Sequence, residues 1–307
     1  MKTSSIIEVH IVSNRILLDE FVDMWNNVKT DEGVTIKVLT TGYQEKKFTL
    51  NNGIKVEYIK QKTFPKTTFM NQAWARNELL CYANSEYILF FDDWQKPHHD
   101  ILAGHLYYLK KGHIVCGRRL DCNKDGSNCR EDGRIGDGNP RICDYGQFWT
   151  CNSSTKLSNI LRVNGFDNRY NGGTGGEDYD MAMRISRLGT KIIYNVNAIA
   201  YHYCHDHIAS GRKGGTAHEH TRNVSAYKYL PEYGHLGDWN LMTSNDFEFW
   251  CEGPIKYFKC IDSGEIGILD SIQVYYHNRD HNIVVAENGL EQVRNCLNNV
   301  KTSEKDV

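Results

Sequence analysis

The chain has 307 residues and a mass of 35.4 kDa, enough for one large α/β domain with an appendage or for two ordinary domains. Its 36 Lys and Arg residues against 38 Asp and Glu residues give a formal net charge of -2, without the basic field typical of nucleic-acid-binding proteins. No apolar run approaches the roughly 18 residues that a membrane-spanning helix needs, and the first residues pass from a short polar start into a strand-like segment. We therefore expect a cytoplasmic protein with no nucleic-acid partner and no transmembrane segment.

The first 91 residues alternate short apolar runs with segments of helical spacing. The expected elements, in chain order, are a strand at 6–13, a helix at 17–28, strands at 34–40 and 54–59, a helix at 69–85 and a strand at 87–91. This alternation predicts an α/β fold with a mostly parallel sheet flanked by helices.

The second half of the chain changes in composition twice. Residues 121–147 are rich in Gly, Asn, Asp, Arg and Cys, which predicts a long loop. Helical and strand signals return at 155–163, 177–188 and 191–201, followed by a second Gly- and His-rich loop at 204–237 and a small C-terminal appendage with a strand at 272–277 and a helix at 287–300. We therefore place a first domain at 1–205, a loop region at 206–246 and the appendage at 247–307.

The 10 cysteines include no CxxC pair, and a chain of this length does not need disulfides for stability. Reduced thiols are therefore expected. A zinc site built from the four cysteines of the central part is an alternative, although their spacings are much wider than those of structural zinc sites. These four are Cys122, Cys129, Cys143 and Cys151.

Two acids, Asp92 and Asp93, directly follow the apolar run YILFF at 87–91. In open parallel sheets, ligands bind beyond the carboxyl ends of the strands. Carboxylates are hard ligands for Mg²⁺ or Mn²⁺, which neutralise a diphosphate. Arg76, in the preceding helix, is a candidate diphosphate contact. The alternative is that the two acids cap the following turn.

A glycine-rich segment leads into the helix expected at 177–188. With 100° per residue, Asp178 shares the apolar face of this helix, whereas Asp180 points away. A carboxylate on the buried side of the first turn can act as the general base for an incoming hydroxyl. The alternative is that these acids only complement the helix dipole, and for Asp180 we expect an exposed ion pair with Arg184.

Histidines cluster in the sequence HYCHDH at 202–207. Strand alternation places His202, Cys204 and Asp206 on one side and the other two histidines opposite, so we expect one metal ligand from this segment rather than a complete site.

An ordered series of motifs resembles the GT-A glycosyltransferases, specifically family 2-like enzymes and the galactosyltransferase and polypeptide N-acetylgalactosaminyltransferase groups. The block at 71–77, followed by the strand and its acids, is similar to the family's N-x-x-x-x-R-N block with its acidic motif. Asn152 and Ser153 followed by VNGFD at 163–167 resemble the "N-x-S … V-G-G-F-D" block, and GTGGEDYDMAMRISRLG resembles the "G-W-G-G-E-D" block. The resemblance covers residues 6–205 and implies a GT-A (Rossmann-like) fold.

By position, the resemblance implies that Asp178 is the base of an inverting transfer, with Glu177 beside it in the acceptor or donor-sugar pocket. It implies donor binding by Arg76, Asn77, Asp92, Asp93, Gly175 and Gly176. It also implies a metal site at Asp93 and His202 that holds Mn²⁺ or Mg²⁺. Trp94 stands where the family's D-x-D motif usually ends in a carboxylate.

The implied activity is transfer of a hexose, with galactose or N-acetylgalactosamine preferred, from a nucleoside diphosphate sugar to a hydroxyl of a carbohydrate or glycoconjugate acceptor. Two alternatives stay open. One is a catalytically degenerate sugar-nucleotide or carbohydrate-binding protein of the same fold, suggested by Trp94. The other is a zinc-binding hydrolase or interaction module built from the His and Cys clusters.

Overall fold

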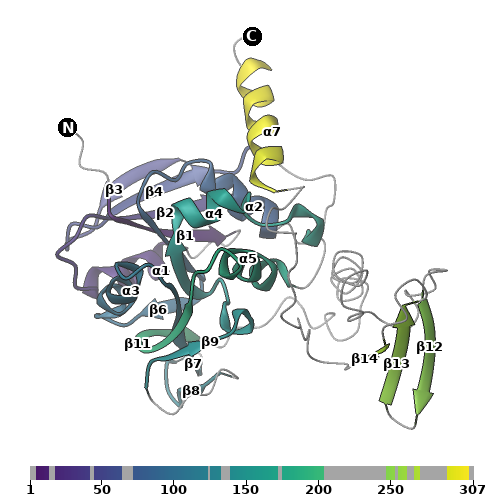
Figure 1. Ribbon diagram of the computed structural model, residues 1–307. Coiled ribbons are helices and arrows are strands. Elements are labelled where there is room, and N and C mark those ends of the chain that lie inside the picture. The colour runs from purple at the N-terminus through teal and green to yellow at the C-terminus, as the bar shows by residue number, and fades with distance from the viewer. Residues whose placement is uncertain are drawn as a thin grey trace.

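The computed structural model describes residues 5–13, 18–41, 45–63, 72–123, 125–132, 139–171, 175–203, 247–252, 255–260, 266–269 and 289–303. Within these residues, a large mixed sheet is flanked by helices on both faces (Figure 1). None of the helices described is long and apolar enough to cross a membrane.

The large sheet has the strand order β3-β4-β2-β1-β5-β10-β7-β11-β6. Short strands β8 (Arg130–Glu131) and β9 (Arg141–Cys143) pair with β7 and β11. The main strands are β1 (Ile7–Ser13), β2 (Val34–Thr40), β3 (Lys46–Thr49), β4 (Lys55–Lys60), β5 (Tyr87–Phe91), β6 (Gln95–Pro97), β7 (Ile114–Cys122), β10 (Asn152–Lys156) and β11 (Ile192–Tyr203). Neighbours β4, β2, β1 and β5 are parallel, as are β7 and β11, whereas β10 is antiparallel to both β5 and β7.

Alternation along β5 explains how the sheet is covered on both faces. Leu89 and Phe91 join one apolar cluster, which includes residues of α1 (Leu18–Asp23), η1 (Met24–Asn27) and α3 (Ile101–Leu109). Ile88 and Phe90 join the opposite cluster, with residues of α2 (Gln72–Leu80), α4 (Leu157–Arg162), α5 (Glu177–Ser186) and α7 (Leu290–Ser303). The sequence of such a strand is a continuous apolar run because both of its faces are buried.

The strand directions bring the functional candidates to one edge of the sheet. β1, β5, β7 and β11 all run toward this edge, where they end at Ser13, Phe91, Cys122 and Tyr203. Antiparallel β10 begins there, since Asn152 pairs with Phe91. The crevice at such an edge is the common ligand site of α/β sheets.

The strands expected at 6–13, 34–40, 54–59, 87–91 and 191–201 are confirmed as β1, β2, β4, β5 and β11, and the last helix as α7. Residues 155–163 are different from the prediction. They begin as the end of β10 and become helical only from Leu157, because residues 152–156 fill the gap between β5 and β7. The strand expected at 272–277 and the loop at 204–237 lie outside the described residues.

The loop expected at 121–147 is wrong in part. β7 continues to Cys122, β8 pairs back onto β7, β9 pairs with β11, and a 3₁₀ turn, η2 (Tyr145–Gln147), follows. A disulfide between Cys122 and Cys129 closes the β7–β8 hairpin. The low apolar content wrongly indicated a loop, because short strands at the border of a sheet need no apolar periodicity.

The same disulfide corrects the expectation that all the thiols are reduced. It also occupies two of the four cysteines from which the alternative zinc site would be built. Neither Cys143 nor Cys151 forms a disulfide in the structure. Disulfides are typical of oxidising compartments. The cytoplasmic location therefore stays a prediction, which the thiol state of Cys122 and Cys129 will test.

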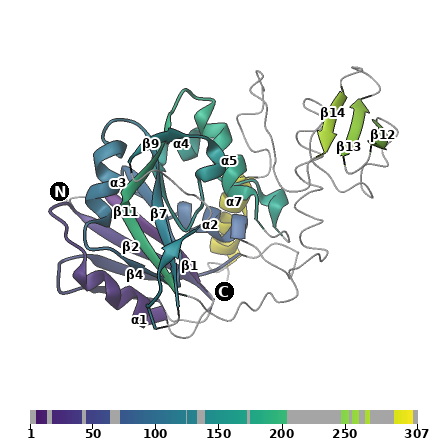
Figure 2. The same cartoon turned by 90° about the horizontal axis from the view of Figure 1, so that it is seen from below.

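In the C-terminal region, a separate antiparallel sheet contains β12 (Phe247–Glu252), β13 (Ile255–Cys260) and β14 (Ile266–Leu269). Helix α7 lies beside α2 in both views (Figure 1, Figure 2). Trp74 of α2 is buried in a cluster with Val293 and Leu297 of α7. The final helix is thus part of the core that supports α2.

Candidate functional site

Asp93 lies at the carboxyl edge of the sheet, two residues beyond the end of β5. Its side chain is 7 % exposed, and Ser13 Oγ donates a hydrogen bond of 2.5 Å to Asp93 Oδ2. Ser13 ends β1, the parallel neighbour of β5, so the pairing of these strands fixes the contact. Asp92 and Trp94 on either side are half-buried.

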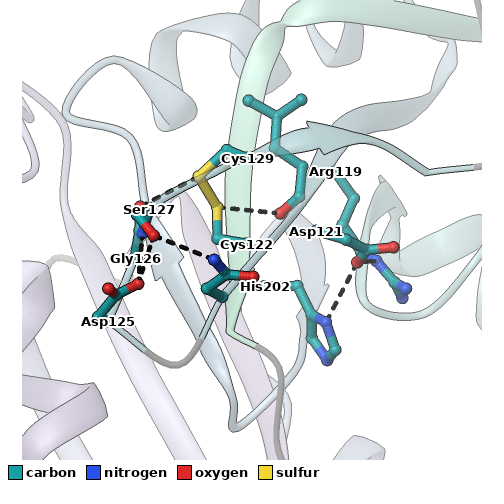
Figure 3. The surroundings of a disulfide bond; sticks show 10 residues. Arg119, Asp121, Cys122, Asp125, Gly126, Ser127, Cys129 and His202 are labelled. Carbon is teal, nitrogen blue, oxygen red and sulfur yellow. Dashed lines mark hydrogen bonds and ion pairs between the residues drawn. A yellow bond between two sulfur atoms is a disulfide. The ribbon is translucent and has the colours of Figure 1, made fainter.

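His202 and Asp121 form a second pair at this edge. They are register partners on the parallel strands β11 and β7, and His202 Nδ1 lies 3.2 Å from Asp121 Oδ1 (Figure 3). Arg119 Nε also donates to Asp121 Oδ1, at 2.9 Å. Burial alone would raise the pKa of Asp121, but the hydrogen bonds from His202 and Arg119 lower it to about 2. Asp121 is therefore a carboxylate at neutral pH that orients the imidazole.

The Cys122–Cys129 disulfide lies next to this pair in the chain, because Cys122 follows Asp121 directly (Figure 3). It joins the end of β7 to the residue before β8, so that the strand carrying Asp121 is covalently closed into a hairpin. The disulfide therefore limits how far the end of β7 can move.

The first turn of α5 carries Glu177 and Asp178. Gly175 and Gly176 precede it with φ values of 133° and 97°, a left-handed backbone region in which a side chain would be strained. Asp178 is half-buried, and its carboxylate accepts backbone hydrogen bonds from Tyr179 and Thr150. Because Thr150 lies two residues before β10, this contact brings α5 to the edge of the sheet that also holds Asp93.

Burial is the main cause that raises the pKa of Asp178 to about 7, and the negative charge of Glu177 adds to it. Arg76 and the two backbone N–H groups act in the opposite direction. A carboxylate with a pKa near neutrality can accept and release a proton at physiological pH, as a general base requires.

Arg76 is predicted to contact a diphosphate, and in the structure its guanidinium forms an ion pair with the buried carboxylate of Glu177. The same guanidinium lies 5.6 Å from the centre of the Phe166 ring. Arg76 thus joins α2 to the start of α5 beside Asp178.

Asn77, also predicted to bind the donor, has no exposed surface. Its amide is used within the protein: Nδ2 donates to the carbonyl of Phe166 at 2.8 Å, and Oδ1 accepts from the Phe166 N–H at 2.9 Å. A Cβ at neighbouring Gly165, whose φ is 69°, would lie 2.4 Å from Asn77 Oδ1. Asn77 therefore holds the turn formed by residues 163–166, the VNGF turn, and its amide is not in an open position toward a ligand.

The expectation that Asp180 and Arg184 form an exposed ion pair is wrong. The pair exists, with Arg184 Nε 2.9 Å from Asp180 Oδ2, but both side chains are fully buried. Arg184 also donates to the carbonyls of Val163 and Gly165, at 2.5 and 2.7 Å. The face calculation failed because the VNGF turn, distant in sequence, covers this side of α5.

The donor atoms at the sheet edge fit a divalent cation chemically. Carboxylate oxygens from Asp93 and one imidazole nitrogen from His202 suit Mn²⁺ or Mg²⁺ when ligand oxygens complete the coordination. The Tyr203 N–H donates to the Trp94 carbonyl at 3.1 Å, so the residues next to His202 and Asp93 are hydrogen bonded. Asp121 adds the carboxylate partner that metal-binding histidines usually have.

Sequence reasoning missed Ser13, Asp121 and Thr150. Ser13 ends an expected strand, and Asp121 follows the run IVCGRRL just as Asp92 follows YILFF. A search for polar residues at the end of each expected strand would therefore have found Ser13 and Asp121. Thr150 offers only its backbone N–H, which no residue pattern reveals.

Residues 140–207, which span β10, α4, α5 and β11, match the family described as the N-terminal domain of galactosyltransferase. No curated protein sequence matches the chain significantly.

Solved structures resemble this fold at low identity. A crystal structure of GalNAc-T7 with UDP, GalNAc and Mn²⁺ aligns with a TM-score of 0.56 and 12% identity, covering 76% of this chain and 49% of the other. S. aureus TarS (residues 1–349) with UDP-GlcNAc aligns with a TM-score of 0.53 and 9% identity, covering 73% of this chain and 66% of the other. The chain thus spans about half to two thirds of the length of these neighbours. The neighbours show that the fold is that of the GT-A glycosyltransferases, and the family match covers residues 140–207 alone.

Proposed function

We propose that the protein transfers a hexose from a nucleoside diphosphate sugar to a hydroxyl group of a carbohydrate or glycoconjugate acceptor. The observation that carries the proposal is Asp178, a half-buried carboxylate with a pKa of about 7 at the ligand-binding edge of a GT-A sheet. The donor is a UDP-sugar, with galactose or N-acetylgalactosamine preferred. The galactosyltransferase match over 140–207 and the UDP and UDP-GlcNAc of the neighbours support this choice.

In the proposed reaction, the acceptor hydroxyl attacks the anomeric carbon while Asp178 takes its proton, and the bond to the nucleoside diphosphate breaks. A single base on the acceptor side gives inversion at the anomeric carbon. A Cβ at Gly175 would have no atom within 4 Å, so the backbone before α5 has room for the donor sugar, and the charge of the buried Glu177 beside it is compensated by Arg76.

Asp93 and His202 would hold a divalent cation, with Asp92 beside them toward the nucleotide. Asp121 and Ser13 fix the two ligands in place. When bound, this ion stabilises the negative charge of the departing diphosphate. The Mn²⁺ in the GalNAc-T7 structure supports the choice of ion.

The experiment measures UDP release by the purified full chain with UDP-galactose, UDP-N-acetylgalactosamine, UDP-glucose and UDP-N-acetylglucosamine, each with Mn²⁺ or EDTA and with a panel of glycan acceptors. We expect turnover with one donor, lost in EDTA. GDP-, dTDP- and CMP-sugars serve as controls. A rise in Tm with a donor but no turnover would instead favour a sugar-nucleotide-binding protein, the function suggested by Trp94.

A further inference from the structure

Three consecutive residues between β6 and α3 form a cluster of possible metal ligands away from the site described above. His98, His99 and Asp100 each offer one ligand atom, and these three atoms all lie within 4.8 Å of one another. The imidazoles of His98 and His99 are stacked, with ring centres 3.9 Å apart, and His99 Nε2 lies 2.8 Å from Asp100 Oδ2. Among the described residues this is the one group of three or more His, Cys, Asp or Glu side chains that meets this criterion.

The backbone of this cluster is fixed by contacts to three different elements. The His98 N–H donates to the carbonyl of Ile199 on β11 at 3.0 Å, and the Lys29 N–H donates to the carbonyl of His99 at 2.8 Å. The carbonyl of Asp100 accepts from the Gly104 N–H of α3 at 3.1 Å. Folding of the sheet and helix therefore brings the three side chains together, and their mutual attraction is not needed to do so.

The cluster is accessible, and its present partners are weak competitors. The ammonium group of Lys29 lies 3.2 Å from Asp100 Oδ1, but the Lys29 side chain is 72 % exposed. The Asp100 N–H donates to His98 Nδ1 at 3.2 Å. Exposed ion pairs contribute little to stability, so an incoming cation displaces Lys29 at small cost.

We propose that His98, His99 and Asp100 form an open binding site for a divalent transition-metal ion. Two imidazoles and one carboxylate are the ligand set that suits Zn²⁺, with water in the remaining position. The same set disfavours Mg²⁺, which prefers oxygen ligands in octahedral geometry. The ion would join the end of β6 to the start of α3.

This metal site is separate from the cation site proposed for the donor. Along β11, three residues separate His202 from Ile199, which accepts the hydrogen bond of His98, a distance on the order of 10 Å at about 3.3 Å per residue. Strand β6 begins opposite His202 and then runs antiparallel to β11, so that His98 lies beside Ile199. The proposal therefore does not depend on the glycosyltransferase reaction.

The test measures Zn²⁺ binding to the EDTA-treated full chain by isothermal titration calorimetry, without nucleotide sugar. The variants are His98→Gln/His99→Gln, Asp100→Asn and the matched control His113→Gln, at the other end of α3. Because the chain has 13 histidines, the readout is the difference between proteins. We expect the double variant to lose one equivalent of Zn²⁺, Asp100→Asn to bind it at least about tenfold more weakly, and the control to match the wild type. Equal stoichiometry and affinity in the wild type and the double variant would overturn the proposal.

A second measurement needs no variant. Diethylpyrocarbonate modifies accessible imidazoles, and peptide mass spectrometry reports each histidine separately. Zn²⁺ should protect both His98 and His99 in the wild-type chain while leaving His113 reactive, whereas Mg²⁺ should protect none of the three. Modification of His98 and His99 at unchanged rates in saturating Zn²⁺ would reject the site.

Discussion

Arg76 and Glu177 form an ion pair that connects α2 to the first residue of α5. Glu177 directly precedes Asp178 in the chain, so the positive charge of Arg76 offsets the negative charge of Glu177 next to the proposed base. Without Arg76, the two adjacent carboxylates would repel each other with only backbone N–H groups in compensation, and the pKa of Asp178 would rise further.

The first prediction concerns Asp178→Asn. The amide keeps the shape of the side chain but cannot accept a proton, so we expect kcat to fall by about 10²–10⁴-fold. Donor affinity, measured from the Tm increase with UDP-sugar, should stay within a factor of a few. Asp31→Asn, in the exposed turn before β2, is the control. Full turnover by Asp178→Asn would disprove the assigned role.

The pH dependence of stability gives a second prediction. The folded-state pKa of Asp178, about 7, lies above its ordinary value of 3.8, so the folded state binds more protons between these values and stability falls as pH rises through this range. Asn at this position removes the penalty. One pKa unit corresponds to about 1.4 kcal/mol, and solvent screening of this half-buried group reduces the effect. We expect Asp178→Asn to raise Tm by about 2–4 °C at pH 8.

At pH 4.5 the Tm difference between the wild type and Asp178→Asn should be much smaller than at pH 8, because this pH lies near the lower end of the interval over which Asp178 destabilises the folded state. Thermal scans across pH 4.5–8 supply the comparison. A constant difference between the two proteins would show that Asp178 does not titrate in this interval.

A third prediction tests the buried pair of Asp180 and Arg184. Arg184→Met leaves the Asp180 carboxylate and the Val163 and Gly165 carbonyls without this donor, so we expect a loss of about 3–5 kcal/mol in the free energy of unfolding. Urea denaturation measures it. The double variant Asp180→Leu/Arg184→Met removes the buried carboxylate as well and should lose less. A loss below about 1 kcal/mol for Arg184→Met would mean that water reaches the pair.

The fourth prediction concerns Asp121→Asn. Its carboxylate orients His202 Nδ1, and loss of such a partner weakens metal binding by about 10–100-fold. Mn²⁺ affinity is measured by electron paramagnetic resonance on the full chain, with Asp125→Asn in the nearby exposed turn as the control. Unchanged Mn²⁺ affinity would separate Asp121 from the cation site.

The fifth prediction is chemical. Peptide mapping under non-reducing conditions should recover Cys122 and Cys129 in one cross-linked peptide. Cys122→Ser/Cys129→Ser should lower the free energy of unfolding by about 2 kcal/mol, since the closed loop is short. Alkylation of both thiols in the protein as isolated would contradict the disulfide.

The strands with buried faces were predictable, whereas the local partners of the site were not. YILFF at 87–91 is a continuous apolar run, which is confirmed as β5, and the two acids that follow it lie at the carboxyl edge of the sheet. β10 is polar, NSSTK, yet four of its five residues are buried. Its place in the sheet depends on pairing with β5 and β7, which local propensity does not encode.

Helical periodicity describes one helix and not what covers its other side. It places Asp178 inward and Asp180 outward, whereas Asp180 is fully buried and Asp178 is half-buried. The burial of Asp180 and the role of Asn77 both follow from the VNGF turn, which reaches α5 and α2 from elsewhere in the chain.

The antiparallel strand β10 sets a condition on how this chain is made. β5 has no neighbour on its β10 side until residues 152–156 have left the ribosome. A nascent chain that stops before Asn152 therefore presents an unpaired apolar strand edge, the kind of surface on which chaperones act and aggregates grow. Slow translation through residues 92–156 would thus prolong the time during which this edge of β5 is open to misassembly.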